Sequence, residues 1–341
     1  MRLILERVLN WIWYRPNLAK WFLWPLGGIY RLAIEIRRLL YQLGLKATTT
    51  LSIPVIVVGN ITVGGTGKTP FIIWLATELQ TRGYRVSIIS RGYGGKAENW
   101  PQHVDSSSDP QLVGDEPVLL ARATGCLVVV APDRVAAGQA LIAKEQTDVI
   151  LSDDGLQHYP LNRQLEIVVI DGERGLGNGL SLPAGPLREP KSRLGDVDIV
   201  IVNDGSWEHK GAFRTKIVAQ PVYQIIGSRQ KSLEGFRNTT VHAIAGIAHP
   251  SRFFDLLEAA GINVIRHPLP DHAKLDAATL AFGDDLPVFV TEKDAVKCQS
   301  ICHENVWCVP VKLELDAENG DRLIQSILTN TIKCGLGNPH L

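Results

Sequence analysis

Residues 54–70 carry the sequence PVIVVGNITVGGTGKTP, in which a short apolar run leads into a glycine-rich turn. The β-branched residues of Pro54 to Val58 predict a buried strand, and the stretch Phe71 to Thr81 is typical of a helix. Glycines between a strand and a helix let backbone N–H groups converge on phosphate oxygens, and the helix N-terminus adds a favourable potential. The stretch therefore predicts a phosphate-binding loop.

The loop predicts ATP and Mg²⁺ as ligands, because Lys68 would reach the β- and γ-phosphates and the Thr69 hydroxyl would bind the metal. The strict motif has Gly five residues before Gly67, where this chain has Thr62. We interpret the loop as a variant whose flexibility comes from Gly64 and Gly65. The alternative is a glycine-rich turn with an incidental lysine. The predicted nucleotide-binding residues are Thr62, Val63, Gly64, Gly65, Thr66, Gly67, Lys68 and Thr69.

Further short apolar runs alternate with helix-like stretches along the chain, a pattern typical of a mostly parallel sheet covered by helices on both faces. The alternation weakens around residues 205–235 and then resumes. We therefore expect an α/β fold of the P-loop NTPase type with a smaller C-terminal α/β domain. The predicted boundaries are 1–46 for an N-terminal helical segment, 47–222 for the P-loop core and 223–341 for the smaller domain.

Composition excludes several classes of protein. Hydrophobic residues make up 45% of the 341 residues and charged residues 21%, which excludes global disorder. The formal net charge of zero argues against a nucleic-acid-binding protein, and no obligate protein partner is inferred. The odd count of five cysteines, without an export signal, indicates reduced thiols in the cytoplasm. The spacing of Cys298, Cys302, His303 and Cys308 matches no standard zinc site.

Residues 1–46 form the most basic segment, with eight basic residues against two acidic ones. They also hold four of the eight tryptophans, Trp11, Trp13, Trp21 and Trp24. No apolar run approaches the roughly 20 residues that a bilayer span requires. Tryptophan and arginine on an amphipathic helix suit a lipid headgroup interface, which predicts a membrane-associated segment. The alternative is a helix that packs its tryptophans on the P-loop core, and both can hold on different faces.

Acidic and glycine-rich clusters follow several predicted strands. Asp153 and Asp154 come directly after the apolar run at 148–152, the usual place of a second Mg²⁺ ligand beside a P-loop. A solvated Asp-Asp-Gly turn is the alternative. The other clusters are RGYGG at 91–95, GDEP at 114–117, PDR at 132–134 and LPAGPLREP at 182–190. We expect these clusters to meet in one cleft.

Taken in order, these motifs resemble those of the tetraacyldisaccharide 4′-kinase (lipid A 4′-kinase) family. The matching stretches are VGNITVGGTGKTP, SRGYGG, VGDEP, APDR, SDDGLQH, LPAGPLREP, AIAGIAHPSRFF, LPDHA and TEKDAVK, which cover nearly the whole chain. The resemblance implies transfer of the ATP γ-phosphate to the 4′-hydroxyl of a tetraacylated glucosamine disaccharide 1-phosphate, the step that forms lipid IVA in lipid A synthesis. It also implies peripheral or monotopic association with the cytoplasmic face of the inner membrane.

The same resemblance implies roles for individual residues. Asp115 would orient His272 and the pair would activate the attacking hydroxyl, while Lys68 and Arg188 would stabilise charge on the transferring phosphoryl group. The resemblance adds Glu189 to the metal ligands Thr69, Asp153 and Asp154 that the phosphate loop and the strand end predict, and the implied substrate contacts are Arg91, Tyr93, Arg134 and His158.

Simpler interpretations of the pair remain open at this point. Asp115 could be an ordinary acidic residue in a helix first turn, and His272 a surface loop histidine. The chain also departs from the family pattern at Leu156, where an aromatic residue is common, and at Ala273, where an aromatic residue or His is common. Two other functions compete: a kinase of another sugar or a soluble metabolite, and a P-loop ATPase that acts as a membrane-associated regulator.

Overall fold

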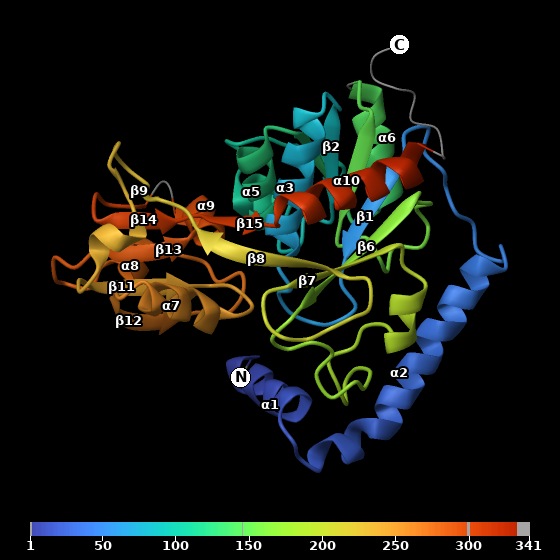
Figure 1. Cartoon of the computed structure of the whole chain (residues 1–341), viewed down its shortest axis with the longest axis horizontal. Coiled ribbons are helices and arrows are strands. Elements are labelled where there is room, and N and C mark those ends of the chain that lie inside the picture. Colours follow the sequence, from blue (N-terminus) through green and yellow to red (C-terminus); the bar gives the residue numbers. More distant parts are fainter. Residues whose placement is uncertain (1, 145, 299–300, 333–341) are drawn as a thin grey trace.

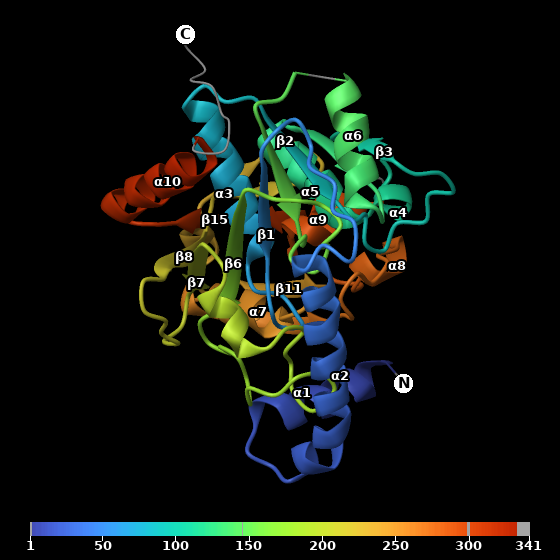
Figure 2. The same ribbon diagram turned by 90° about the vertical axis from the view of Figure 1, so that its right-hand side faces the viewer.

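The computed structural model describes residues 2–144, 146–298 and 301–332, and within these residues the strands form one nine-stranded and one six-stranded sheet (Figure 1). We call each sheet with its helices the larger and the smaller unit. The N-terminal helices α1 (Arg2–Tyr14) and α2 (Ala19–Gln42) project from one side of the larger unit in both views (Figures 1 and 2).

The larger unit contains the strands β1 (Val55–Gly59), β2 (Val86–Ser90), β3 (Gln102–Val104), β4 (Leu127–Val130), β5 (Val149–Asp153), β6 (Leu165–Asp171), β7 (Ile199–Asn203), β8 (Phe213–Ala219) and β15 (Val311–Glu314). Its helices are α3 (Lys68–Thr81), α4 (Pro110–Val113), α5 (Asp115–Thr124), α6 (Arg134–Lys144), the 3₁₀ helix η1 (Lys191–Gly195) and α10 (Ala317–Ile332).

The smaller unit contains the strands β9 (Val222–Gln224), β10 (Gln230–Lys231), β11 (Thr240–Ala245), β12 (Asn263–Pro268), β13 (Val288–Thr291) and β14 (Val306–Val309). Its helices are the 3₁₀ helix η2 (Leu233–Phe236), α7 (Pro250–Ala259), α8 (Ala277–Leu280) and α9 (Glu292–Cys298).

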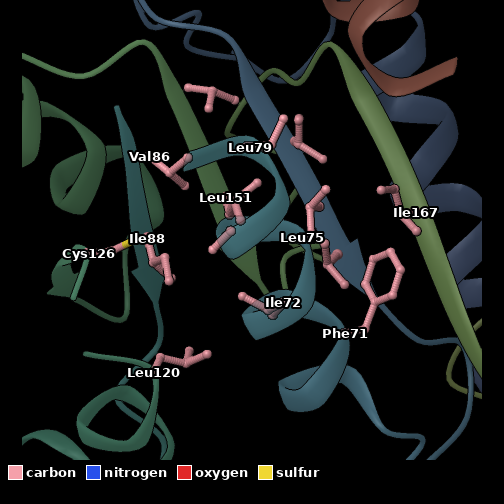
Figure 3. Packing of buried hydrophobic residues seen from close by; sticks show 14 of the residues in the cluster. Phe71, Ile72, Leu75, Leu79, Val86, Ile88, Leu120, Cys126, Leu151 and Ile167 are labelled. Carbon is pink, nitrogen blue, oxygen red and sulfur yellow. The ribbon is translucent and has the colours of Figure 1, made fainter. Parts of the chain in front are cut away.

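The larger sheet has the order β15-β8-β7-β6-β1-β5-β2-β4-β3, and its pairs are parallel except at the two edge strands. Alternate residues of β1 enter different cores. Ile56 and Val58 pack with α3, α5 and α10, whereas Val55 and Val57 pack with α6. Figure 3 shows the first of these cores, in which Phe71 and Leu75 of α3 lie over the sheet. The expected mostly parallel α/β fold with helices on both faces is confirmed.

The end of the described chain returns to the larger unit. The predicted boundary placed residues 223–341 in the smaller domain, whereas β15 pairs antiparallel with β8 along Lys216–Ala219. Helix α10 then buries Leu323, Ile324 and Ile327 in the larger core. The physical reason is that β8 would otherwise be an unpaired edge and the core would lack one covering helix.

Some side chains of helices α1 and α2 pack against the larger unit, whereas others are exposed. Trp13 is only 7% exposed, and its Nε1 donates to the Pro183 carbonyl at 2.9 Å. Trp21 and Phe22, by contrast, are 58% and 86% exposed. Gly27 lets α2 approach residues 181–184 closely, because a Cβ there would lie 2.9 Å from the Ser181 carbonyl oxygen. None of the helices in the described ranges is long and apolar enough to cross a bilayer.

Candidate active site

A cavity of about 1220 Å³ lies where the carboxyl ends of the larger unit's parallel strands face the smaller unit. Open α/β sheets bind ligands at this edge. Its walls come from three parts of the molecule: the loops that follow strands of the larger unit, the smaller unit around α7 and α9, and the N-terminal helices through Trp13, Tyr30 and Arg37. Most of the predicted site residues line it: Val63 to Thr69, Arg91, Tyr93, Arg134, Asp153, Asp154, His158, Arg188 and His272.

The loop after β1 has the geometry of a phosphate cradle. Only Gly64 and Gly67 take positive φ values in it, at 105° and 85°. Position 62 does not require glycine, because Thr62 is buried and pairs with Leu187 in a short antiparallel bridge. A Cβ at Gly67 would lie 1.9 Å from Asn203 Nδ2, so this position requires glycine for space as well as for φ. Helix α3 begins at Lys68, with its N-terminus directed at the cavity.

Asp154 brings two cations to the cavity floor. Lys68 Nζ lies 3.3 Å from Asp154 Oδ1, and Arg188 Nη1 donates to both Asp154 oxygens at 3.2 and 3.0 Å. Burial raises the pKa of Asp154, but Lys68 and Arg188 outweigh it and hold the pKa well below its usual range. The arrangement collects two cations next to the cradle, where phosphate oxygens would be neutralised.

Asp153 has the surroundings of a metal ligand. It is buried and accepts a hydrogen bond from Ser90 Oγ at 2.9 Å. Burial, Glu116 and Asp154 together raise the pKa of Asp153 to about 7. A divalent cation would relieve this negative potential, and Thr69, Asp153 and Asp154, which line the same cavity, carry the oxygen donors that Mg²⁺ takes together with phosphate and water. Among the described residues no cluster of three or more His, Cys, Asp or Glu side chains could hold a metal alone.

Glu189 is the predicted metal residue that the structure does not bring to the cavity. Its side chain is 1% exposed. One carboxylate oxygen accepts from Gln157 Nε2 at 2.7 Å, and the other accepts from Tyr159 OH and Arg193 Nε at 3.1 and 3.0 Å. Its oxygens are therefore occupied by neighbouring donors. In this position Glu189 fixes the segment that carries Arg188.

Asp115 and His272 come together across the two units. His272 Nδ1 lies 2.9 and 3.1 Å from the two oxygens of Asp115, which is 4% exposed at the start of α5. Burial raises the pKa of Asp115, but the hydrogen bond from His272 and the charge of Lys293 bring it below its ordinary value. Asp115 is therefore a carboxylate that accepts from Nδ1–H, which leaves the Nε2 lone pair for a substrate proton. Tyr93 lies beside this imidazole with ring centroids 5.0 Å apart.

Arg134 and His158 form a second polar group in the cavity wall. Arg134 is buried, and its Nε has no hydrogen-bond partner among the described residues. Burial and the nearby Arg134 lower the pKa of His158 to about 4, so this imidazole is neutral at pH 7. Both residues line the cavity, while Arg91 is exposed at its rim. A guanidinium among the lining residues of a cavity suits an anionic or hydroxyl-rich ligand.

Two further cavity residues, His249 and Lys293, belong to motifs that match the family but had no predicted role. His249 of AIAGIAHP lies over the phosphate loop, where a Cβ on Gly64 would be 3.3 Å from its Nε2. Burial and the charges of Arg174 and Arg252 lower the pKa of His249 to about 3. Lys293 of TEKDAVK lies 3.3 Å from His272 Nε2. In the sequence, each is a polar residue close to apolar runs, with no pattern that indicates a role. Its place in the cavity depends on how the two units pack against each other.

The departures at Leu156 and Ala273 do not change the cavity wall. Leu156 is fully buried against β1, where a Cβ on Gly59 would lie 2.7 Å from its Cγ. Ala273 contributes a backbone carbonyl that accepts from Lys297 Nζ at 3.0 Å. Neither side chain is among the cavity residues.

Comparison with known proteins agrees with this geometry. The family model described as tetraacyldisaccharide-1-P 4′-kinase, LpxK, matches residues 19–329. A tetraacyldisaccharide 4′-kinase of Nitrosococcus oceani is 50% identical over 321 residues, which are 94% of each chain. One of Alkalilimnicola ehrlichii is 50% identical over 317 residues, covering 93% of this chain and 95% of the relative.

A solved structure is similar over nearly the same range. LpxK from Aquifex aeolicus, crystallised in complex with ATP, superposes with a TM-score of 0.77 at 28% identity. The match covers 92% of this chain and 100% of that one. On the family match, the two relatives and this structure, the chain belongs to the tetraacyldisaccharide-1-P 4′-kinase family.

Proposed function

We propose that this ATP-dependent kinase transfers the γ-phosphate of ATP to the 4′-hydroxyl of a tetraacylated glucosamine disaccharide 1-phosphate. The observation that carries the proposal is a single cavity lined both by the phosphate loop of the larger unit and by His272, whose Nδ1 lies 2.9 Å from the buried carboxylate of Asp115. A P-loop alone would suit many nucleotide-hydrolysing proteins. An oriented imidazole facing the same cavity is what an enzyme needs to take a proton from an alcohol acceptor.

In the mechanism that follows, Asp115 keeps the Nδ1–H tautomer of His272 and Nε2 accepts the proton of the attacking hydroxyl. The loop N–H groups and the N-terminus of α3 hold the phosphates, and Lys68 and Arg188 stabilise the charge on the transferring group. Phosphoryl transfer is driven mainly by positioning and electrostatics, so the base makes the smaller contribution. Thr69, Asp153 and Asp154 would hold Mg²⁺, which supplies further charge neutralisation when bound.

The acceptor side of the cavity is the side that α1 and α2 approach. Trp13, Tyr30 and Arg37 line the cavity, while Trp21, Phe22 and Trp24 are exposed on the same helices. A glycolipid must present its sugar to the catalytic residues while its acyl chains stay in an apolar environment. We propose that α1 and α2 lie in the headgroup region at the cytoplasmic face of the inner membrane, with Arg91, Tyr93, Arg134 and His158 contacting the sugar and phosphate groups.

An acceptor panel tests the proposal. The protein is incubated with [γ-³²P]ATP and Mg²⁺ and with one of three additions: the tetraacyldisaccharide 1-phosphate in mixed micelles, a water-soluble monosaccharide set, or detergent alone. We expect label in the glycolipid, with ³¹P NMR placing the new phosphate on the 4′-oxygen. Label in a soluble sugar would favour the kinase of another substrate. ATP hydrolysis independent of any acceptor would favour a regulatory ATPase. Either outcome would contradict the proposal.

A further inference from the structure

Lys293, the first lysine of α9, places its ammonium group against the catalytic pair. Its Nζ lies 3.1 Å from Glu116 Oε1, 3.2 Å from Asp271 Oδ1 and 3.3 Å from His272 Nε2. The side chain is 13% exposed. Glu116 belongs to α5 of the larger unit, whereas Asp271 and His272 belong to the smaller one. The lysine therefore bridges the units at the imidazole itself.

The two nitrogens of His272 have partners of different kinds. Nδ1 faces the carboxylate of Asp115, so it donates, and Nε2 carries the lone pair. A lysine ammonium can only donate a hydrogen bond. In the tautomer that carries its proton on Nδ1, Lys293 thus donates to the lone pair that would otherwise accept the hydroxyl proton of the substrate, while Asp271 Oδ2 lies 3.7 Å from the same nitrogen, beyond hydrogen-bond distance.

Lys293 keeps its charge in this position. Burial lowers its pKa, but Glu116, Asp115 and Asp271 outweigh burial and raise the pKa above its ordinary value. Lys297, one turn further along α9, differs in its contacts. Its Nζ lies 2.6 Å from Asp294 and 3.9 Å from Asp115, and it makes no contact with the imidazole. Of the two lysines, Lys293 alone is placed to act through His272.

We propose that Lys293 is a positioning residue of the kinase reaction. Its ammonium group donates a hydrogen bond to His272 Nε2 and so holds the ring with this nitrogen at the cavity. When the acceptor binds, its hydroxyl group replaces Lys293 as the hydrogen-bond partner of Nε2. The inference rests on the proposed function, since it assigns the lone pair of His272 to the acceptor. The backbone at His272 supports it, because this residue has a φ of 60° in the left-handed region. A strained backbone of this kind persists only where surrounding contacts hold it, and Asp115 and Lys293 supply one contact to each ring nitrogen.

The test compares four variants by kcat and by KM for ATP, with the glycolipid acceptor in mixed micelles. Lys293→Met removes the charge and the donor, Lys293→Gln replaces the ammonium with a neutral amide on a shorter side chain, and Lys293→Arg keeps a charged donor. Lys274→Met is the matched control, because Lys274 also reaches the larger unit, at Gln111 3.3 Å away, without touching His272. If Lys293→Met does not fold, Lys293→Gln carries the comparison. Thermal melts and ATP affinity establish which variants are folded.

We expect Lys293→Met to lower kcat by about 10- to 100-fold, the scale of a displaced catalytic group, and to leave KM for ATP within about threefold. Lys293→Arg should recover most of the loss, and Lys274→Met should match the wild type. In a His272→Ala background, Lys293→Met should cost less than about threefold, since residues acting as one unit are non-additive. An equal loss with and without His272, or no loss at all, would overturn the inference. A wild-type protein that never labels the glycolipid would instead overturn the proposed function.

Discussion

At the scale of single residues, the phosphate loop depends on one shared carboxylate. Asp154 holds Lys68 and Arg188 at the mouth of the cradle, at 3.3 Å and 3.0 Å. Asp154 itself has a φ of 49°, an unusual conformation for a residue other than glycine. Such strain at a cavity wall is typical of a functional position. The three charges therefore act as a set, and removing one alters the other two.

Lys68→Ala removes a preorganised cation from the transferring phosphoryl group. We expect kcat to fall by at least about 100-fold, the effect of losing one such electrostatic contact. The measurement is initial-rate phosphoryl transfer to the glycolipid. Lys216→Ala, which removes an exposed lysine from β8, serves as the control and should keep wild-type kcat. A folded Lys68→Ala protein with near-normal turnover would contradict the P-loop assignment.

Most residues of the site could be predicted from the sequence, because the motifs directly follow predicted strands. The carboxyl ends of parallel strands lie at the same edge of a sheet, where ligands bind. The sequence predicted a variant loop with Thr62 in place of glycine and with its flexibility at Gly64 and Gly65, whereas the positive φ values fall at Gly64 and Gly67. Glu189 and Lys293 could not be placed in this way. Their positions depend on hydrogen-bond partners more than 20 residues away in sequence, such as Gln157 for Glu189 and His272 for Lys293.

At the scale of elements, α1 and α2 carry an exposed apolar face beside the cavity. Large side chains on this face, Trp11, Leu18, Trp21, Phe22, Trp24, Leu26, Ile29, Leu32, Ile36 and Leu39, are each at least 45% exposed. Exposed apolar side chains gathered in one segment of a protein usually mark an interaction site. The alternative interpretation of the sequence was that the tryptophans pack on the protein. Of the four tryptophans, only Trp13 is buried in this way. Periodicity alone could not say which tryptophan faces the protein.

Removing part of this face should weaken membrane binding without affecting the ATP site. The triple variant Trp21→Ser, Phe22→Ser and Trp24→Ser loses side chains that would each gain about 1 kcal/mol or more on burial from their present exposure. We expect partitioning onto phosphatidylglycerol–phosphatidylethanolamine vesicles to fall by about 100-fold.

A matched control removes three exposed apolar side chains elsewhere: Leu112→Ser, Ile226→Ser and Ile265→Ser. Co-sedimentation is measured for both triple variants, with ATP affinity as the check on the nucleotide site. Equal losses in the two variants, or none in either, would contradict an interfacial role for α1 and α2.

At the scale of the whole molecule, the site exists only because two sheets face each other. Alternating apolar runs predicted both sheets, but not that β15 and α10 return to the larger one. Residues 216–219 pair with residues 311–314, which are far away in the sequence. The local pattern of apolar residues can indicate a strand but not its partner. This return connects the smaller unit to the larger one through two chain segments, the one after β8 and the one before β15. Asp115 and His272 meet across the interface that these connections create.

The most direct test of this account is a double-mutant cycle on Asp115 and His272. If the carboxylate orients the imidazole, Asp115→Ala and His272→Ala should each lower kcat by about 100-fold or more, the lower end of general-base effects. The double variant should then be little worse than the poorer single one, with KM for ATP nearly unchanged. The measurement is kcat with the glycolipid acceptor in mixed micelles. Fully multiplicative losses would contradict the account, because the two residues would then act independently and the units would not share one catalytic site.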